Sequence, residues 1–164
     1  MRERAPAAEL VRNAVLRQIY RAGYWVLWAR ALATHPHGRG VKGLIQNDGA
    51  VLFVRHTYGP HEWEFPGGGQ QRNEPPHEAI ARELREELGI EVSDPQTLGT
   101  LNGPNQYANN LVTVFSFVVA DRSVQPDPVE IAEVRWCPPS DPPHPLGWYA
   151  QEILRRNGES LASS

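Results

Sequence analysis

The sequence holds very little sulfur, with one cysteine, Cys137, and one methionine in 164 residues. A single cysteine excludes an internal disulfide, and it fits a protein of the reducing cytoplasm. Long apolar runs are also missing, because the most hydrophobic stretch near the N-terminus, residues 22–29, has arginine on both sides. A membrane-spanning helix needs about 20 apolar residues, and no apolar run follows the charged first residues as in a signal peptide. We therefore expect a soluble protein with no membrane partner.

Neither sign of charge is in large excess, because 16 Lys and Arg are set against 19 Asp and Glu, for a formal net charge of −3. This balance gives no general attraction to nucleic acid, and we expect no nucleic-acid partner. The length suits one domain with an apolar core. We expect an N-terminal helical extension over residues 1–38, the main domain over 39–158 and a loose tail over 159–164.

Apolar residues recur at helical spacing near the N-terminus, at Val11, Val15, Ile19 and Val26. The pattern predicts a helix over residues 10–33. Such a helix can lie against the domain or against a second subunit, so a homodimer is one expectation. The alternative is a helix lying in a membrane interface, for which the amphipathic pattern is modest.

Short apolar runs separated by turn residues predict strands in the rest of the chain. The expected strands are residues 41–46, 50–55, 63–65, 98–101, 111–120 and 134–137. A helix is expected over residues 74–88, with prolines in its first turn and Gly89 at its end. Another helix is expected over residues 146–156. Strands around one central helix, with a second helix near the C-terminus, predict an α/β/α sandwich.

The central helix carries three acids on one edge. At about 100° per residue, Glu83, Glu86 and Glu87 share an arc of about 100° and leave no basic residue within it. Ile80 and Leu84 lie on an adjacent apolar stripe that can face the sheet. The acids therefore lie at the edge of a buried helix face.

Two interpretations of this acidic edge are open. Two like charges about 4 Å apart cost roughly 4 kcal/mol at an effective dielectric of 20, and Mg²⁺ or Mn²⁺ would remove this repulsion by taking carboxylate oxygens. The alternative is a solvated acidic face, which the pairs Glu78–Arg82 and Arg82–Glu86 at i,i+4 favour. The pair Glu83–Glu87 at the same spacing is repulsive and favours the metal site.

Three consecutive glycines, residues 67–69, stand a few residues before this helix. Glycine permits positive φ and a close approach of the backbone to a ligand. A carbonyl of this loop can complete a metal shell, and its amides can meet phosphate oxygens. A plain turn is the alternative, and the acidic helix that follows makes the ligand-binding interpretation stronger.

The segment from Gly68 to Ile90 resembles the Nudix box, G-x5-E-x7-R-E-U-x-E-E-x-G-U with U aliphatic. The matching residues are Gly68, Glu74, Arg82, Glu83, Leu84, Glu86, Glu87, Gly89 and Ile90. A looser similarity extends over residues 41–137, and Asn73 stands where many members have glycine. The resemblance implies the Nudix fold with a mixed central sheet. It also implies metal-dependent hydrolysis of a phosphoanhydride bond in a nucleoside diphosphate linked to another moiety.

By this resemblance Glu83, Glu86 and Glu87 are the metal ligands, and the carbonyl of Gly68 is a candidate fourth. The metal implied is Mg²⁺ or Mn²⁺, which lowers the pKa of a water molecule and neutralises the anhydride oxygens.

Two further glutamates come from the same resemblance. Glu74 corresponds to the glutamate that pairs with the box arginine, here Arg82, and the pair would orient the acids. Glu130 lies six residues before Trp136, where some members place a catalytic or metal-binding glutamate; an exposed loop acid is the alternative. The general base implied is one of Glu83, Glu86, Glu87 and Glu130, with Glu83 slightly favoured.

Loop residues offer candidates for substrate binding. Arg55 can hold a phosphate with its forked donors, and Tyr58 and Tyr107 can stack on a base. The expected substrate is a small-molecule nucleotide. The alternatives are an enzyme that acts on the 5′ end of RNA and a catalytically silent Nudix domain that binds a nucleotide or a protein.

Overall fold

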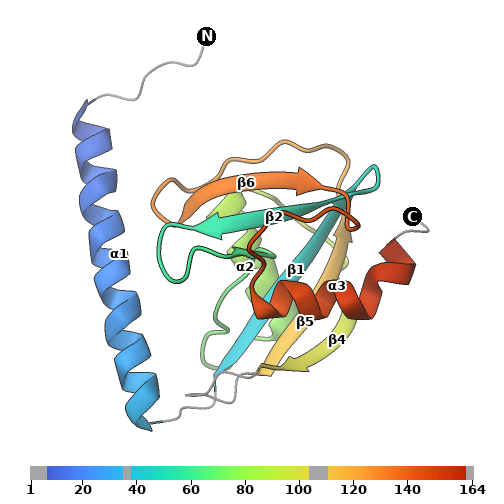
Figure 1. Cartoon of the computed structure of the whole chain (residues 1–164), viewed down its shortest axis with the longest axis horizontal. Helices are drawn as coiled ribbons and strands as arrows, with labels where there is room; N and C mark the ends of the chain where they lie inside the picture. The colour runs from blue at the N-terminus through green and yellow to red at the C-terminus, as the bar shows by residue number, and fades with distance from the viewer. Residues whose placement is uncertain (1–6, 35–37, 104–110, 162–164) are drawn as a thin grey trace.

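The computed structural model describes residues 7–34, 38–103 and 111–161. Within these ranges it contains three helices and six strands (Figure 1). The helices are α1 (Ala7–Thr34), α2 (Pro76–Leu88) and α3 (Trp148–Leu161). The strands are β1 (Arg39–Asn47), β2 (Ala50–His56), β3 (Trp63–Glu64), β4 (Gln96–Asn102), β5 (Leu111–Val118) and β6 (Ile131–Cys137).

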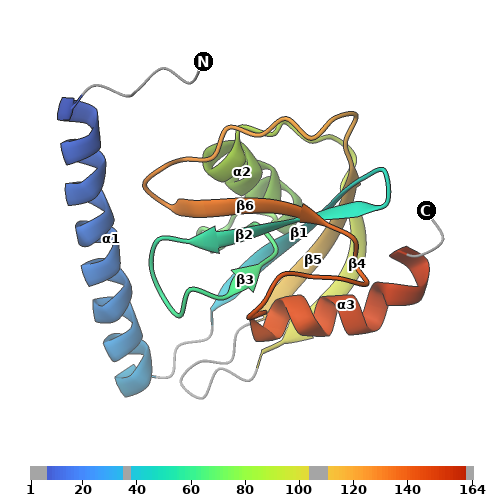
Figure 2. The same cartoon turned by 45° about the horizontal axis from the view of Figure 1, so that its top comes forward.

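The strands form one mixed sheet in the order β3-β2-β1-β5-β4, and β6 also pairs with β2. β1 and β5 are parallel, whereas the other pairs are antiparallel. α2 and α3 lie on opposite faces of this sheet (Figures 1 and 2). The predicted α/β/α sandwich with a mixed sheet is therefore confirmed.

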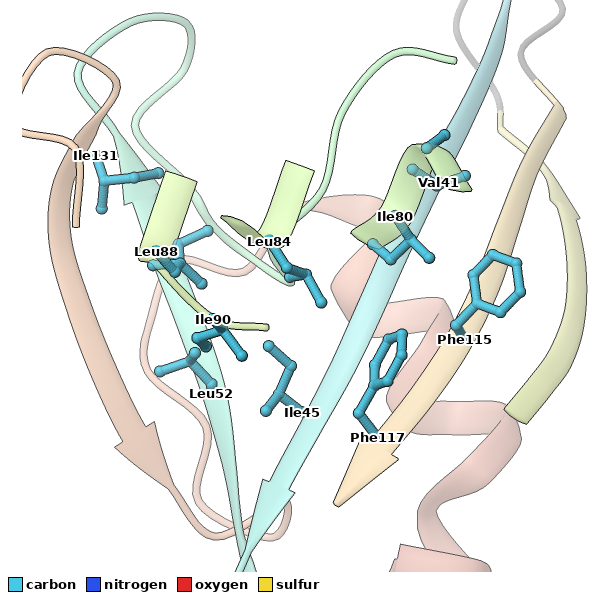
Figure 3. Packing of buried hydrophobic residues seen from close by; sticks show 12 residues of the cluster. Val41, Ile45, Leu52, Ile80, Leu84, Leu88, Ile90, Phe115, Phe117 and Ile131 are labelled. Carbon is cyan, nitrogen blue, oxygen red and sulfur yellow. The ribbon is translucent and has the colours of Figure 1, made fainter. Parts of the chain in front are cut away.

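β1 and β2 pair only next to their hairpin turn, at Gln46–Val51 and Asn47–Ala50, and they separate beyond these residues. α2 lies over the space that opens between the two strands (Figure 3). Ile80, Leu84 and Leu88 are fully buried there. The predicted apolar stripe thus fixes the rotation of the helix about its axis, and its acidic edge comes to lie beside the apolar core.

A second apolar cluster fills the other face of the sheet under α3. Phe53 stacks on Phe65 at a centroid distance of 4.9 Å, and Leu146 and Ile153 belong to the same cluster. Trp63, in the short strand before the glycine loop, is 2% exposed and is a core residue.

Several element ends differ from the sequence-based expectation. β6 begins at Ile131 instead of residue 134, because β2 pairs with it past a bulge between Arg55 and His56. α3 continues to Leu161, into the segment expected to be a loose tail. Gly89 ends α2 as expected, with φ of 66°.

α1 lies outside the sandwich, along the edge formed by the loop after β2 and the loop before β6 (Figures 1 and 2). Arg17 donates a hydrogen bond from Nε to the carbonyl of Pro128 at 2.7 Å. Val11, Val15 and Ile19 lie on the opposite side of the helix and are exposed. In the described part of the chain, no helix is long and apolar enough to cross a membrane.

Candidate active site

The glycine loop is fastened to the first half of β1. The amide of Gly43 donates to the carbonyl of Pro66 at 2.9 Å, and the amide of Val41 donates to that of Gly68 at 3.0 Å. Gly67 has φ of 123°, and a Cβ atom there would lie 2.4 Å from the Val41 carbonyl oxygen. Only glycine fits at position 67, because the backbone of the loop approaches β1 closely there.

Glu83 lies directly against this loop. A Cβ atom added at Gly68 would lie 2.7–2.9 Å from the carboxylate atoms of Glu83, so glycine at this position makes the contact possible. The carbonyl of Gly68 already accepts the hydrogen bond from Val41, and a role as metal ligand would use its second lone pair. Two of the residues expected at the metal site, Glu83 and Gly68, therefore lie side by side.

Glu87 is the most buried acid of α2, with 3% of the residue exposed. Its Oε2 accepts a hydrogen bond from the amide of Gly67 at 3.1 Å, and its Oε1 lies 3.2 Å from Nε2 of His56. The side chain thus joins α2, the glycine loop and the end of β2. The contact with His56 is a feature that the sequence did not indicate.

Arg82 donates hydrogen bonds to the three box acids apart from Glu87, which are Glu74, Glu83 and Glu86. Its Nε and Nη2 donate to Glu74 at 2.8 and 2.9 Å, and Nη1 donates to Glu83 at 2.9 Å and to Glu86 at 3.1 Å. Nη2 also donates to the carbonyl of Gly69 at 3.0 Å. The expected Glu74–Arg82 pair is present. Arg82 lies on the neighbouring face of α2, outside the acidic arc as expected, and its long side chain reaches Glu83 and Glu86 from there.

The acids of the box differ in their surroundings. Burial raises the pKa of Glu83, the hydrogen bond from Arg82 opposes this, and the negative charge of Glu87 raises it further. The side chain of Glu86 is 57% exposed, and it is paired with Arg82 at the surface. Hydrogen bonds from Arg82 and from the amide of Gln71 lower the pKa of Glu74 to about 2.

This donor set fits a hard divalent cation. Glu83 and Glu87 are crowded like charges in a partly buried site, and their oxygens are the ligands that Mg²⁺ and Mn²⁺ prefer. In the described ranges, no group of three or more His, Cys, Asp or Glu side chains is already gathered at metal-binding geometry. Glu86, held by Arg82 and largely exposed, is the acid that would have to turn toward the other two.

Glu130 is close to the same acids, although it follows a distant loop. The amide of Thr57 donates to the Glu130 carbonyl at 2.9 Å, and this bond joins the end of β2 to the turn before β6. Burial raises the pKa of the Glu130 carboxyl, and the charges of Glu87 and Asp127 add to this effect. Glu130 is half-buried, which disfavours the alternative of an exposed loop acid.

The candidate substrate residues lie in different places. Arg55 forms an ion pair with Glu133, and its guanidinium lies 5.3 Å from the centre of the Trp63 ring. Tyr58 lies 5.2 Å from the ring of His56, beside the acids. Tyr107 falls outside the described residues.

A cavity of about 230 Å³ opens beside His56. Its lining includes Lys42, Tyr58, Glu64 and Tyr149, which come from β1, the loop after β2, β3 and α3. The sequence did not indicate this cavity, because its walls are far apart in the chain. A larger hollow of about 410 Å³ lies beyond Gly89 at the C-terminal end of α2, and Glu83, Glu86 and Glu87 do not line it.

Comparison with known proteins decides the family. A model of the NUDIX domain matches residues 35–156, which is well over half of the chain. The chain belongs to the Nudix family. The resemblance inferred from the box is thereby confirmed, and the glycine loop, α2 and Glu130 all fall within the matched Nudix region, whereas α1 precedes it.

Nudix proteins of known structure share the fold. The MutT protein of Methanosarcina mazei is 25% identical, with a TM-score of 0.67 over 77% of this chain and 96% of that chain. The Nudix domain of Shewanella oneidensis NrtR, solved with ADP-ribose, is 18% identical, with a TM-score of 0.66 over 76% of this chain and 88% of that chain.

Curated relatives match over a shorter stretch. An RNA pyrophosphohydrolase of Halorhodospira halophila is 49% identical over 56 residues, which are 34% of this chain and 30% of the relative. An ADP-ribose pyrophosphatase of Mycobacterium tuberculosis is 44% identical over 66 residues, which are 40% of this chain and 32% of the relative. The matched part is therefore about a third of the length of these relatives.

Proposed function

We propose that this chain is a divalent-metal-dependent hydrolase that cleaves a phosphoanhydride bond in a small nucleoside diphosphate linked to another moiety. The observation that carries the proposal is the meeting of Glu83 and Glu87 with the glycine loop at Gly67 and Gly68. Crowded carboxylates next to backbone amides suit a cation and a phosphate together. A plain acidic surface would not need the glycine contacts.

Glu83, Glu86 and Glu87 would hold the metal, with the Gly68 carbonyl as a further ligand. Nudix hydrolases generally use divalent metal ions, and Mg²⁺ or Mn²⁺ fits these oxygen donors. When bound, the cation supplies neutralisation of the anhydride oxygens and activation of water. Arg82, anchored by Glu74, keeps the acids oriented and balances part of their charge.

The reaction needs a carboxylate that removes a proton from the attacking water while the water oxygen attacks phosphorus. The phosphate on the other side of the bridging oxygen then leaves with the electrons of the broken P–O bond. Glu83, Glu86, Glu87 and Glu130 are the candidates for the base. Glu83 is favoured because it is half-buried and lies against the loop, where a phosphate would approach.

The nucleoside would lie in the cavity beside His56. Tyr58 offers a ring for stacking on a base, and Lys42 brings a positive charge. In the described part of the chain, the hydroxyl of Tyr149 is buried without a hydrogen-bond partner, and Oε2 of Glu64 is buried with only the ammonium of Lys42 near it, at 3.8 Å. Buried polar atoms without partners are costly, and a polar base or ribose edge would satisfy them.

The experiment is a panel of nucleotides incubated with Mg²⁺ or Mn²⁺, followed by measurement of nucleoside monophosphate and phosphate. ADP-ribose, other nucleoside diphosphate compounds and an RNA with a 5′-triphosphate end should be included. Release of a monophosphate from the small compounds supports the proposal. Binding of several compounds without cleavage of any would show a silent binding domain instead.

RNA is a second candidate substrate because several similar relatives are named RNA pyrophosphohydrolases. The formal charge of −3 argues against it, since RNA-binding surfaces carry a basic stripe. Faster cleavage of the RNA end than of every small compound would decide for this candidate.

We also propose that α1 packs against a second copy of the chain. Val11, Val15 and Ile19 form a stripe that faces away from the sandwich, and each is more than half exposed. An apolar stripe of this kind is expected to be covered by a protein surface.

A further inference from the structure

Tyr20, on α1, reaches residues that border the acidic cluster. Its hydroxyl donates a hydrogen bond to the carboxylate of Glu130. Its ring lies 6.3 Å from the ring of Tyr58, and Tyr58 in turn lies 5.2 Å from the ring of His56. Nε2 of His56 is 3.2 Å from Glu87. A continuous series of contacts therefore leads from α1 to the acids of α2.

The turn that carries Glu130 is held from two sides. On one side, the amide of Asp127 donates to the carbonyl of Glu87, at the end of α2, at 2.8 Å. On the other side, Arg17 of α1 donates to the carbonyl of Pro128 at 2.7 Å. Arg17 and Tyr20 are three residues apart and lie on the same face of the helix. The hydrogen bonds of Arg17 and Tyr20 thus both fall on one short turn.

The carboxylate of Glu130 is half-buried, and acids and bases lie on several sides of it. Burial raises the pKa of its carboxyl, and Glu87 and Asp127 add like charges, whereas Tyr20 and His56 act in the opposite direction. A hydroxyl that donates to a carboxylate stabilises the charged form and fixes its orientation.

We propose that Tyr20 is a positioning residue of the active site, which holds the carboxylate of Glu130 in one orientation beside Glu87. The N-terminal helix would then complete the site, although it lies before the matched Nudix region. This inference rests on the proposed hydrolase function, for which Glu130 is one of the candidate catalytic acids.

The two parts of the tyrosine have separate roles. The hydroxyl acts on Glu130, so its removal should lower kcat and leave KM unchanged. The ring lies next to Tyr58, which lines the cavity proposed for the nucleoside. Loss of the whole side chain should therefore also raise KM.

The test compares Tyr20→Phe, Tyr20→Ala and the exposed control Gln18→Ala in the full chain. The substrate is the compound of the nucleotide panel that the wild type cleaves fastest with Mg²⁺. Tyr20→Phe should lower kcat about tenfold, since a hydrogen bond to a charged group is lost. Tyr20→Ala should lower kcat by the same factor and raise KM, whereas Gln18→Ala should match the wild type.

A double-mutant cycle with Glu130→Gln shows whether Tyr20 acts through Glu130. In the Glu130→Gln background, Tyr20→Phe should change kcat less than about twofold, because the partner is already altered. Thermal unfolding of the metal-free variants supplies a readout that needs no turnover. Tyr20→Phe should lower Tm in the wild-type background and much less in the Glu130→Gln background.

Three results would overturn the inference. If the wild type is active and Tyr20→Phe keeps its full kcat, the role of Tyr20 is excluded and the hydrolase function is unaffected. Equal losses of kcat in both backgrounds show that Tyr20 does not act through Glu130. A wild type that cleaves no compound removes the proposed function and this inference together.

Discussion

Arg82 has four hydrogen-bonded partners, and this determines how the negative charge of the box is balanced. Glu74 takes two of the donors, while Glu83 and Glu86 share Nη1, and the carbonyl of Gly69 is the fourth partner. The box holds four carboxylates, those of Glu74, Glu83, Glu86 and Glu87, and one guanidinium cannot neutralise all of them. The cluster therefore keeps an excess of negative charge. A divalent cation is the simplest partner for that excess.

Replacement of Glu86 by glutamine should abolish hydrolysis and leave the fold intact. The change removes a charge from an exposed side chain and little volume, so the core is not altered. We expect a loss of kcat of at least about 100-fold, since a metal-binding carboxylate is lost. Glu78→Gln is the matched control, because Glu78 is an exposed acid on the same helix outside the acidic arc. Near-normal turnover of Glu86→Gln would exclude Glu86 from the metal site.

The Glu74–Arg82 pair should make stability depend on pH. The fold lowers the pKa of Glu74 from 4.5 to about 2, so the pair stabilises the protein above pH 4.5 and loses this effect as the pH falls toward 2. Urea unfolding should therefore show that wild type exceeds Glu74→Gln in stability at pH 7, with a smaller difference at pH 3. A difference that stays constant between these pH values would contradict the role of the ion pair.

At the scale of elements, the glycine loop and α2 act as one unit. Gly67 is required because its φ is positive and a Cβ atom would strike the Val41 carbonyl, whereas a Cβ atom added at Gly69 would meet nothing within 4 Å, and the φ of Gly69 is not positive. Gly67→Ala should lower the free energy of unfolding by at least about 1–3 kcal/mol, and Gly69→Ala should change it by less than about 0.5 kcal/mol. Urea unfolding of both variants measures this. Equal effects would mean that the loop does not need its close approach to β1.

Local patterns predicted the elements that carry the site. The helical spacing of Ile80 and Leu84 predicted both α2 and its buried face, and the glycines predicted the tight loop before it. Contacts between distant segments were not visible in the sequence. Glu64 and Tyr149 meet at one cavity only because α3 lies over β3, and Tyr20 meets Glu130 only because α1 lies along the edge of the sheet.

The start of β6 could not be predicted from the residues of that strand alone. Its residues 131–133 are recognised as part of the strand only through their partners on β2, across a bulge. Glu130 was therefore predicted as either a catalytic acid or a solvated loop acid. Its backbone hydrogen bond to Thr57 places it beside the acids of α2.

At the scale of the whole molecule, the exposed stripe of α1 predicts self-association. Light scattering of the full chain should give about twice the monomer mass of 18.4 kDa. Val15→Asp should restore the monomer mass, because a charge would be buried in the shared surface. A wild-type chain that is monomeric at all concentrations used would exclude the dimer.

The proposed hydrolysis depends on a cation held between α2 and the glycine loop. A crystal structure with Mn²⁺ and a non-hydrolysable nucleoside diphosphate analogue tests this most directly, since manganese is located by its anomalous scattering. We expect manganese within about 2.2 Å of carboxylate oxygens of Glu83, Glu86 and Glu87, with the diphosphate against the amides of the loop. Carboxylates turned to solvent, with no metal between them and the diphosphate bound elsewhere, would contradict the account.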